Sequence, residues 1–252
     1  MMTDAELMHY SRQLLLADID VEGQIRLNQS HVIVLGLGGL GSPVALYLGA
    51  AGVGRLTLVD GDIVDQTNLH RQIIHSQSSL NTWKVDSARN RIQGLNPYIQ
   101  VDVIREHANE KNMVSLVPDT DCIADCTDSF ATRFLANRLA LMHKRPVVSA
   151  AALGLEGQLT TIDPRSSDHP CYACLVPDVP EVEMTCSETG VLGPLVGALG
   201  TLQAVEIIGI LLDWPDRLVG RLLRFHAKSM NWKSFRYQKD PECSTCGSAR
   251  KL

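Results

Sequence analysis

The sequence lacks several features that mark common protein classes. It contains no internal repeat and no low-complexity tract, which argues against repeat proteins and largely disordered chains. With 45% hydrophobic and 20% charged residues, it has an ordinary globular composition. Its 252 residues are enough to bury the core of one large domain.

Two further absences concern location and partners. The N-terminal run MMTDAELMHYSRQLLL carries acidic residues and no basic flank, so we do not expect a secretory signal. The formal net charge of −5 argues against a polyanion such as DNA as the main partner. We therefore expect a cytoplasmic protein that acts on neither a nucleic acid nor a membrane.

The most membrane-like segment is VLGPLVGALGTLQAVEIIGILL, from Val191 to Leu212. Gln203 and Glu206 stand near its middle, and glycine and proline residues interrupt it. Polar and charged side chains are expensive inside a bilayer. We therefore expect a buried core helix here.

The order of the segments predicts an α/β fold. A strand, a glycine-rich loop, a helix and a second strand follow one another between residues 31 and 60. The runs VDVIR, CIADC and PVVSAAA are typical of buried parallel strands. After residue 156, the runs GQLTTID, LLRFHA and KSFRYQ alternate as half-exposed antiparallel strands do. Further helices are expected at 3–16, 83–95 and 129–144.

These elements predict a single domain over residues 1–252. We expect a Rossmann-like, doubly wound, mostly parallel sheet that continues into an antiparallel C-terminal half. An N-terminal helical arm takes residues 1–28, and a nucleotide-binding half takes residues 29–153. Residues 154–252 form the second half of the same body.

The stretch VLGLGGLGSP carries the first functional signal. Gly36, Gly38 and Gly41 form a GxGxxG pattern directly after an apolar strand and before a helix. Backbone N–H groups at a helix N-terminus bind phosphate, and glycine lets that backbone come close. Asp60 ends the next strand, where an acidic residue can accept a ribose hydroxyl. The loop predicts nucleotide binding without identifying the nucleotide.

The cysteines carry the second signal. Cys171 and Cys174 form one CxxC pair, and Cys243 and Cys246 form another. Each pair can offer two thiolates to a tetrahedral Zn²⁺. A thioredoxin-like redox motif is the alternative, but such motifs open a helix after a strand, whereas these pairs follow turn-rich segments. We expect one structural zinc site with four cysteine ligands that ties the chain end to the body.

Cationic and amide side chains follow the nucleotide loop. Asn68 and Arg71 lie on a loop just past the strand that ends at Asp60, and Lys84 comes shortly after. A nucleoside triphosphate needs cations along its phosphates, whereas NAD needs only its pyrophosphate cradled. Arg89 and Arg91 also follow, but a solvated helix face accounts for them.

A carboxylate for Mg²⁺ is also available. Asp128, in CIADCTDS, comes just past another apolar strand, at the edge where such sheets bind ligands. Asp125 lies within that strand and is the weaker candidate. This combination favours ATP with Mg²⁺ over a dinucleotide.

The chain resembles the MoeB/ThiF/HesA adenylyltransferases, relatives of ubiquitin-activating enzymes that activate ubiquitin-like sulfur carriers. The resemblance covers almost the whole chain through segments in the same order: RQLLL, VLGLGGLGSP, LTLVDGDIVDQTNLHRQ, KVDSAR, DCTDSFATR, EGQLT, PCYACL, TCSETGVLGPLVGALGTLQAVE and CSTCG. It implies a homodimer that binds ATP, Mg²⁺ and a carrier ending in Gly-Gly. The carrier's terminal carboxylate attacks the α-phosphate, which gives an acyl-adenylate and pyrophosphate. Residues 154–252 would bind the carrier and zinc.

The resemblance also implies roles for particular residues. Asp60 would bind ribose, and Asp128 would coordinate Mg²⁺. Arg12 matches an arginine that the other subunit contributes in trans. The residues expected around the nucleotide are Gly36, Gly38, Gly39, Gly41, Asp60, Asn68, Arg71, Gln72, Lys84, Asp128 and Ser129.

Two positions raise separate questions. Asn81 stands where the family usually has glycine, and asparagine tolerates a positive φ better than most residues. Cys186, in TCSETG, matches a cysteine that the thiazole branch is proposed to link to its carrier; a loop thiol without a catalytic duty is the alternative. Cys122 and Cys126 are expected in the core.

Several readings stay open at this point. The carrier is expected to belong to molybdopterin synthesis, with the thiazole carrier of thiamine synthesis as the alternative. Sulfur would come from a separate sulfurtransferase or cysteine desulfurase. More distant alternatives are an NAD-dependent oxidoreductase, suggested by the glycine loop, and a non-catalytic, zinc-stabilised scaffold that binds the carrier.

Overall fold

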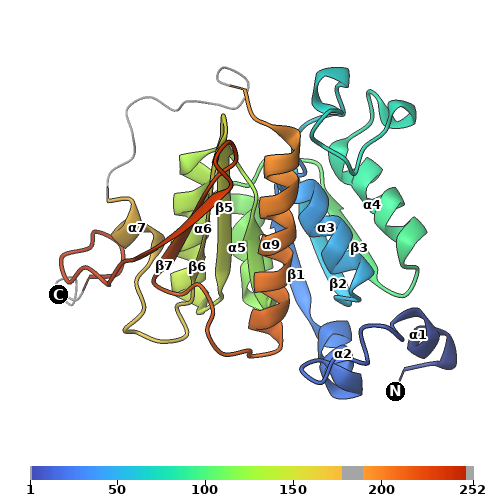
Figure 1. Ribbon diagram of the computed structural model, residues 1–252, viewed down its shortest axis with the longest axis horizontal. Coiled ribbons are helices and arrows are strands. Elements are labelled where there is room, and N and C mark those ends of the chain that lie inside the picture. Colours follow the sequence, from blue (N-terminus) through green and yellow to red (C-terminus); the bar gives the residue numbers. More distant parts are fainter. Residues whose placement is uncertain (1, 178–189, 248–252) are drawn as a thin grey trace.

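The computed structural model describes residues 2–177 and 190–247 (Figure 1). Within them, eight strands form one sheet in the order β3-β2-β1-β4-β5-β6-β7-β8. The strands are β1 (His31–Leu35), β2 (Arg55–Val59), β3 (Gln100–Ile104), β4 (Cys122–Asp125), β5 (Val147–Leu153), β6 (Glu156–Ile162), β7 (Arg221–His226) and β8 (Asn231–Arg236). Strands β1 to β5 are parallel, and β6 to β8 extend the sheet in antiparallel fashion. The expected mixed α/β sheet is confirmed.

Helices cover both faces of the parallel strands. They are α1 (Asp4–His9), α2 (Asp20–Gln29), α3 (Gly41–Ala50), α4 (Lys84–Leu95), α5 (Glu110–Leu116), α6 (Phe130–His143), α7 (Tyr172–Leu175) and α9 (Gly193–Leu211). Helices α3, α4 and α9 lie in front of the sheet in Figure 1, and α5 and α6 lie behind it. Each layer buries its own apolar cluster.

Strand β1 explains why the sequence shows a continuous apolar run. Successive side chains of a strand point to opposite faces of the sheet. Val32 and Val34 therefore join the cluster under α3, α4 and α9, whereas Ile33 and Leu35 join the cluster under α5 and α6. All five residues of β1 are buried, because both faces are covered.

The N-terminal arm differs from expectation. The single helix expected at 3–16 is wrong, because α1 ends at His9 and a second helix, α2, follows. The chain turns at Tyr10, whose ring is 3% exposed and whose hydroxyl accepts a hydrogen bond from Asn96 Nδ2 at 2.8 Å. Helix α2 buries only Gln24 and Leu27, so it presents no apolar stripe that a sequence pattern could reveal.

Helix α9 is the apolar segment that resembles a membrane span. By length and composition alone it could cross a bilayer, and 56% of its most apolar window is buried inside the protein. It packs on α3 and on strands β4, β5 and β6. The expectation of a core helix is confirmed.

The two polar residues of α9 have partners in the sheet. Gln203 is fully buried, and its Nε2 donates to the carbonyls of Asp125 and Val148, both at 2.9 Å. Glu206 Oε1 accepts from Thr161 Oγ1 at 2.7 Å and from a backbone N–H at 2.6 Å. These bonds tie α9 to the end of β4, the start of β5 and the end of β6.

We predict that Gln203→Leu lowers the free energy of unfolding by about 2–3 kcal/mol, because two buried carbonyls lose their donor. Urea unfolding measures the change. Gln29→Leu, at an exposed position in α2, is the matched control and should change stability by less than about 0.5 kcal/mol. Equal stability of the two variants would contradict the role of Gln203.

Candidate active site

A cleft of about 390 Å³ opens at the carboxyl ends of β1, β2 and β4. This is the edge where open α/β sheets bind ligands. The residues expected around a nucleotide that line it are Gly36, Gly38, Gly39, Asp60, Arg71, Gln72, Lys84, Asp128 and Ser129. Gly41 and Asn68 do not line it. Segments far apart in the sequence thus meet in one place.

The four glycines of the loop have different tasks. Gly36 has a φ of +86°, which favours glycine. A Cβ on Gly41 would lie 1.8 Å from the Gly36 carbonyl oxygen, and one on Gly39 would lie 2.7 Å from Val196 in α9. A Cβ on Gly38 would meet only Gln72 Nε2, at 3.7 Å. Three glycines therefore shape the turn, and Gly38 leaves the backbone open to a ligand.

Two buried side chains fix the loop at Leu37. Asp60 Oδ2 accepts the Leu37 N–H at 2.7 Å, and His75 Nε2 donates to the Leu37 carbonyl at 3.1 Å. His75 Nδ1 accepts from Ser87 Oγ at 2.9 Å. Burial lowers the pKa of His75 to about 4, so the ring is neutral at pH 7. His75 is a supporting residue that the sequence did not reveal.

The carboxylate of Asp60 also orders the following loop. Its Oδ1 accepts the N–H of Asp62 at 2.8 Å, and burial raises its pKa, with the nearby Lys84 opposing the effect. Lys84 is 5% exposed, and its Nζ lies 2.7 Å from Asp62 Oδ2. Asp62 was not foreseen, although it is the second acid of the VDGD stretch. His107 Nε2 lies 3.6 Å from Asp62 Oδ1 at the rim.

Arg71 and Gln72 reach the cleft from the loop after η1 (Gln66–Asn68). Arg71 donates to Asn68 Oδ1 at 2.8 Å, so Asn68 orients the guanidinium and does not line the cleft itself. Gln72 is 4% exposed, and its Oε1 has no hydrogen-bond partner among the described residues. A buried amide oxygen without a partner is costly unless a ligand or water satisfies it.

The two aspartates after β4 play separate parts. Asp125 is 1% exposed, and it accepts hydrogen bonds from Ser149 Oγ at 2.5 Å and Thr127 Oγ1 at 2.8 Å. Its position in the strand makes it a structural residue. Asp128 is exposed at the cleft wall, where a carboxylate can meet a cation. The preference for Asp128 over Asp125 as the metal candidate agrees with this placement.

The turn before Lys84 keeps its geometry without glycine. Asn81 has a φ of +63°, and its N–H donates to the Val64 carbonyl at 3.0 Å. The expectation that asparagine supports this conformation is confirmed. The turn holds Lys84 at the start of α4, where its N–H donates to the Asp62 carbonyl at 3.0 Å.

The remaining predicted residues lie away from this cleft. Arg12 is exposed in the segment between α1 and α2, two helices that lie at the lower edge in Figure 1. It does not line the cleft of its own chain. Cys186 lies outside the described residues. Cys122 and Cys126 are buried, as expected for core positions, and Cys126 also borders the cleft.

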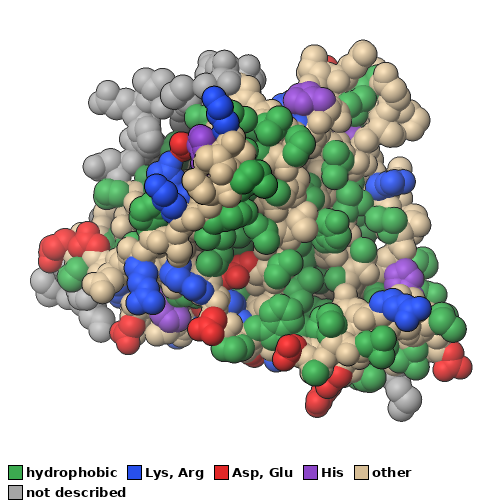
Figure 2. Space-filling view, viewed as in Figure 1, with side chains coloured by type: hydrophobic (Ala, Val, Ile, Leu, Met, Phe, Trp, Pro, Cys, Tyr) green, Lys and Arg blue, Asp and Glu red, His purple; other side chains and the backbone are tan. Residues whose placement is uncertain are grey.

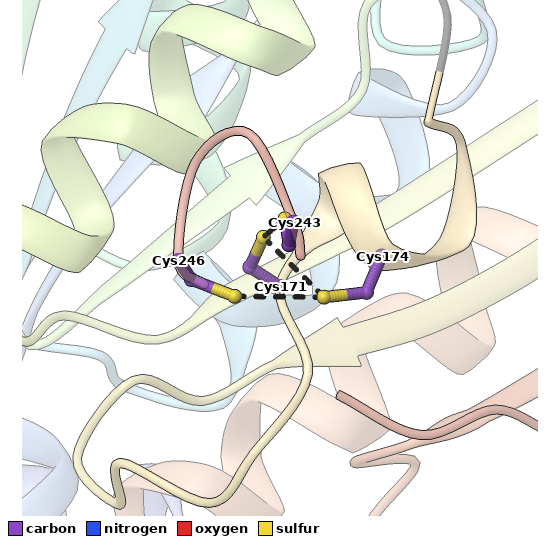
Figure 3. A group of neighbouring side chains, drawn as sticks. All are labelled: Cys171, Cys174, Cys243 and Cys246. Carbon is purple, nitrogen blue, oxygen red and sulfur yellow. Dashed lines mark hydrogen bonds between the residues drawn. The ribbon is translucent and has the colours of Figure 1, made fainter. Parts of the chain in front are cut away.

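The other four predicted cysteines converge where α7 meets the segment 243–246 (Figure 3). Cys171 Sγ lies 3.9 Å from Cys174 Sγ and 3.7 Å from Cys243 Sγ, and Cys174 Sγ lies 3.5 Å from Cys246 Sγ. All four sulfur atoms lie within 4.8 Å of one another. These separations are too long for disulfides. Burial raises the pKa of Cys171 to about 11.

Comparison with known proteins identifies the family of this chain. The ThiF family matches residues 10–245, nearly the whole chain. The chain belongs to the ThiF family. Among curated ThiF relatives, the adenylyltransferase and sulfurtransferase MOCS3 of Culex quinquefasciatus is 42% identical over 96% of this chain and 55% of that protein. The SAMP-activating enzyme E1 of Haloferax volcanii is 40% identical over 96% of this chain and 89% of that protein.

Solved structures share the ThiF fold at lower identity. Escherichia coli MccB with AMPCPP and MccA is 21% identical, with a TM-score of 0.82 over 98% of this chain and 75% of that chain. PaaA is 22% identical, with a TM-score of 0.79 over 95% of this chain and 76% of that chain. At such identity the likeness concerns the fold alone. The chain spans about half the length of the MOCS3 relatives, with 55% covered in the mosquito protein.

Two alanine substitutions test the packing role of Gly41 separately from the expected ligand contact of Gly38. We predict that Gly41→Ala costs about 3 kcal/mol or more, because its Cβ collides with the Gly36 carbonyl. Gly38→Ala should fold within about 0.5 kcal/mol of wild type. It should still weaken nucleotide binding about tenfold or more, a loss of about 1.4 kcal/mol. Thermal unfolding and calorimetric titration test both, and wild-type affinity in Gly38→Ala would contradict the assignment.

Proposed function

We propose that this chain is an ATP-dependent adenylyltransferase that activates the C-terminal Gly-Gly carboxylate of a ubiquitin-like sulfur carrier. Membership of the ThiF family supports the reaction class, and relatives about 40% identical carry the names adenylyltransferase and SAMP-activating enzyme E1. One observation carries the proposal: a single cleft gathers the open Gly38, the partnerless amide oxygen of Gln72, lysine and arginine side chains, and aspartates that include Asp128. We place the reaction in molybdenum cofactor biosynthesis.

The chemistry needs charge and position more than a nucleophilic side chain. The carrier's carboxylate oxygen attacks the α-phosphorus, an acyl phosphate bond forms, and the bond to the leaving pyrophosphate breaks. Arg71 and Lys84 would stabilise the negative charge on the phosphates, and Asp60 would bind the ribose. In this scheme residues 29–153 bind the nucleotide, and residues 154–252 receive the carrier. Arg12 would act in trans within a homodimer.

Two metal ions fit the residues available. Asp128 is an exposed carboxylate in the cleft wall, the type of oxygen ligand that Mg²⁺ shares with nucleotide phosphates. A tetrahedral Zn²⁺ with bonds of about 2.3 Å to sulfur would place the sulfurs about 3.8 Å apart. Three of the sulfur pairs lie 3.5–3.9 Å apart, and all four sulfurs lie within 4.8 Å of one another, which is compatible with that geometry. Four sulfur ligands leave no open position, so we propose a structural role.

A basic surface on β7 and β8 is suited to bind an acidic carrier. Blue side chains gather over these two strands in Figure 2, and Arg224, Lys233 and Arg236 are exposed there. Arg224 stands directly opposite Lys233, and Arg221 stands opposite Arg236. Like charges opposite each other destabilise a sheet. The ion pair of Arg224 with Glu156 in β6 offsets this repulsion in part, whereas Lys233 and Arg236 form no ion pair among the described residues. An acidic partner would pair with these cations, so we propose that the carrier docks here. A sulfurtransferase or cysteine desulfurase would then supply the sulfur.

Adenylation itself is the first test. We predict that the protein, ATP and Mg²⁺ attach AMP to a purified molybdopterin-type carrier and release pyrophosphate. Arg71→Ala and Asp128→Asn should each reduce the rate about 10²–10³-fold, because each removes charge that stabilises the transition state. Mass spectrometry of the carrier and a pyrophosphate assay supply the measurements.

Arg89→Ala is the control, because Arg89 pairs with Asp86 on the surface of α4 and should leave the rate unchanged. A thiazole-type carrier is tested in parallel to decide the pathway. The absence of an AMP adduct with every carrier would refute the proposal. Full activity in both Arg71→Ala and Asp128→Asn would mean that the site is misplaced.

Metal removal tests the cysteine cluster. We predict one zinc per chain by elemental analysis. Removing it with a chelator should loosen α7 and the segment around Cys243, since binding energy at such a site is also folding energy. Hydrogen exchange should accelerate there and recover when zinc is restored. Unchanged exchange in the zinc-free protein would show that the cluster needs no metal.

A further inference from the structure

Arg133 is a buried cation that no part of the proposed reaction has yet used. It lies in the second turn of α6 and is 7% exposed, and the part that stays accessible borders the cleft. Arginine is among the residues least often fully buried unless it is paired. Its sequence context, the ATR of DCTDSFATR, shows only an arginine on a helix.

The Arg133 guanidinium binds the backbone of the residue directly before Asp128. Its Nη2 donates to the Thr127 carbonyl at 2.6 Å, and its Nε lies 3.5 Å from Asp125 Oδ2. Asp125 in turn accepts from the Thr127 hydroxyl at 2.8 Å and from the Thr127 N–H at 3.2 Å. Thr127 is therefore held at its carbonyl, its N–H and its hydroxyl. This fixes the residue that directly precedes Asp128.

The charge of Arg133 survives burial. Burial alone would lower its pKa, but the carboxylate of Asp125 raises it, so the side chain stays a cation. The planar fork of an arginine can hold a carbonyl and face a carboxylate at the same time, which a lysine ammonium cannot do in the same geometry. The ring of Phe130 lies 5.5 Å from the guanidinium carbon and confines it further.

An ion pair with a purely structural role would not need to border the cleft, as Arg133 does. Here the pair joins the end of β4 to the first turns of α6, on either side of the Asp128 loop. A shift of that loop would move Asp128 without unfolding the sheet or the glycine turn. The side chain thus controls the position of one carboxylate of the proposed site.

We infer that Arg133 is a positioning residue, which holds Asp128 where a divalent cation bound with ATP needs it. The inference rests on the proposed function, because it assigns Asp128 to that cation. If the inference holds, a substitution of Arg133 weakens ATP binding in the presence of Mg²⁺ and leaves ATP binding without Mg²⁺ unchanged.

The test compares Arg133→Lys with Arg138→Lys. Arg138 lies on the same helix in an exposed ion pair with Glu110, so its variant is the matched control. ATP binding is measured by calorimetry over a range of Mg²⁺ concentrations and in EDTA. In Arg133→Lys the half-saturating Mg²⁺ concentration should rise about tenfold, equivalent to about 1.4 kcal/mol, with binding in EDTA unchanged. Arg138→Lys should match wild type.

If Arg133→Lys does not fold, the double variant Arg133→Gln with Asp125→Asn replaces it, because it removes both buried charges together. A wild-type Mg²⁺ dependence in the folded variant would overturn the inference. An equal loss of ATP binding with and without Mg²⁺ would also overturn it, since that result marks a general structural defect. A wild-type protein that binds no ATP at all would overturn the proposed function, and this inference with it.

Discussion

The structure depends on how the backbone of Leu37 is held at the turn from β1 to α3. Its N–H is bound by the Asp60 carboxylate and its carbonyl by the neutral His75 ring. Asp60 comes from the end of β2 and His75 from the loop that precedes α4. The same two contacts therefore shape the glycine turn and fix the loop that carries Arg71 and Gln72. A cleft built in this way is organised before any ligand arrives, which lowers the cost of binding.

The sequence predicted the parts of this arrangement that are local. The glycine loop, the aspartates just past β2 and β4 (Asp60 and Asp128), and the two CxxC pairs each show within a few residues. The partners that hold them do not, because Lys84 and Asp62 are 22 residues apart and His75 and Leu37 are 38 apart. Arg133 looked like any helix arginine, since only the fold brings Asp125 and Thr127 to it. The end of α1 at His9 was missed as well, and the buried hydrogen bond at the following residue, Tyr10, comes from Asn96, 86 residues away in the sequence.

The second half of the sheet ends in an exposed edge strand, β8. Strands β6 to β8 extend the parallel sheet, and β8 forms its edge with every residue exposed. An uncovered edge strand is a hazard for aggregation unless charges or a partner protect it. The cations on β7 and β8 supply that protection. The four-cysteine cluster joins the segment at Cys243 to α7, so the end of the described chain is attached to the body.

We propose that the cleft holds ATP with a divalent cation and no redox dinucleotide. The most direct measurement is calorimetric titration of the wild-type protein with ATP and with NADH, each with and without Mg²⁺. We predict that ATP binds, that Mg²⁺ strengthens its binding, and that NADH does not compete. NADH binding that ATP cannot displace would contradict the account and return the glycine loop to the oxidoreductases.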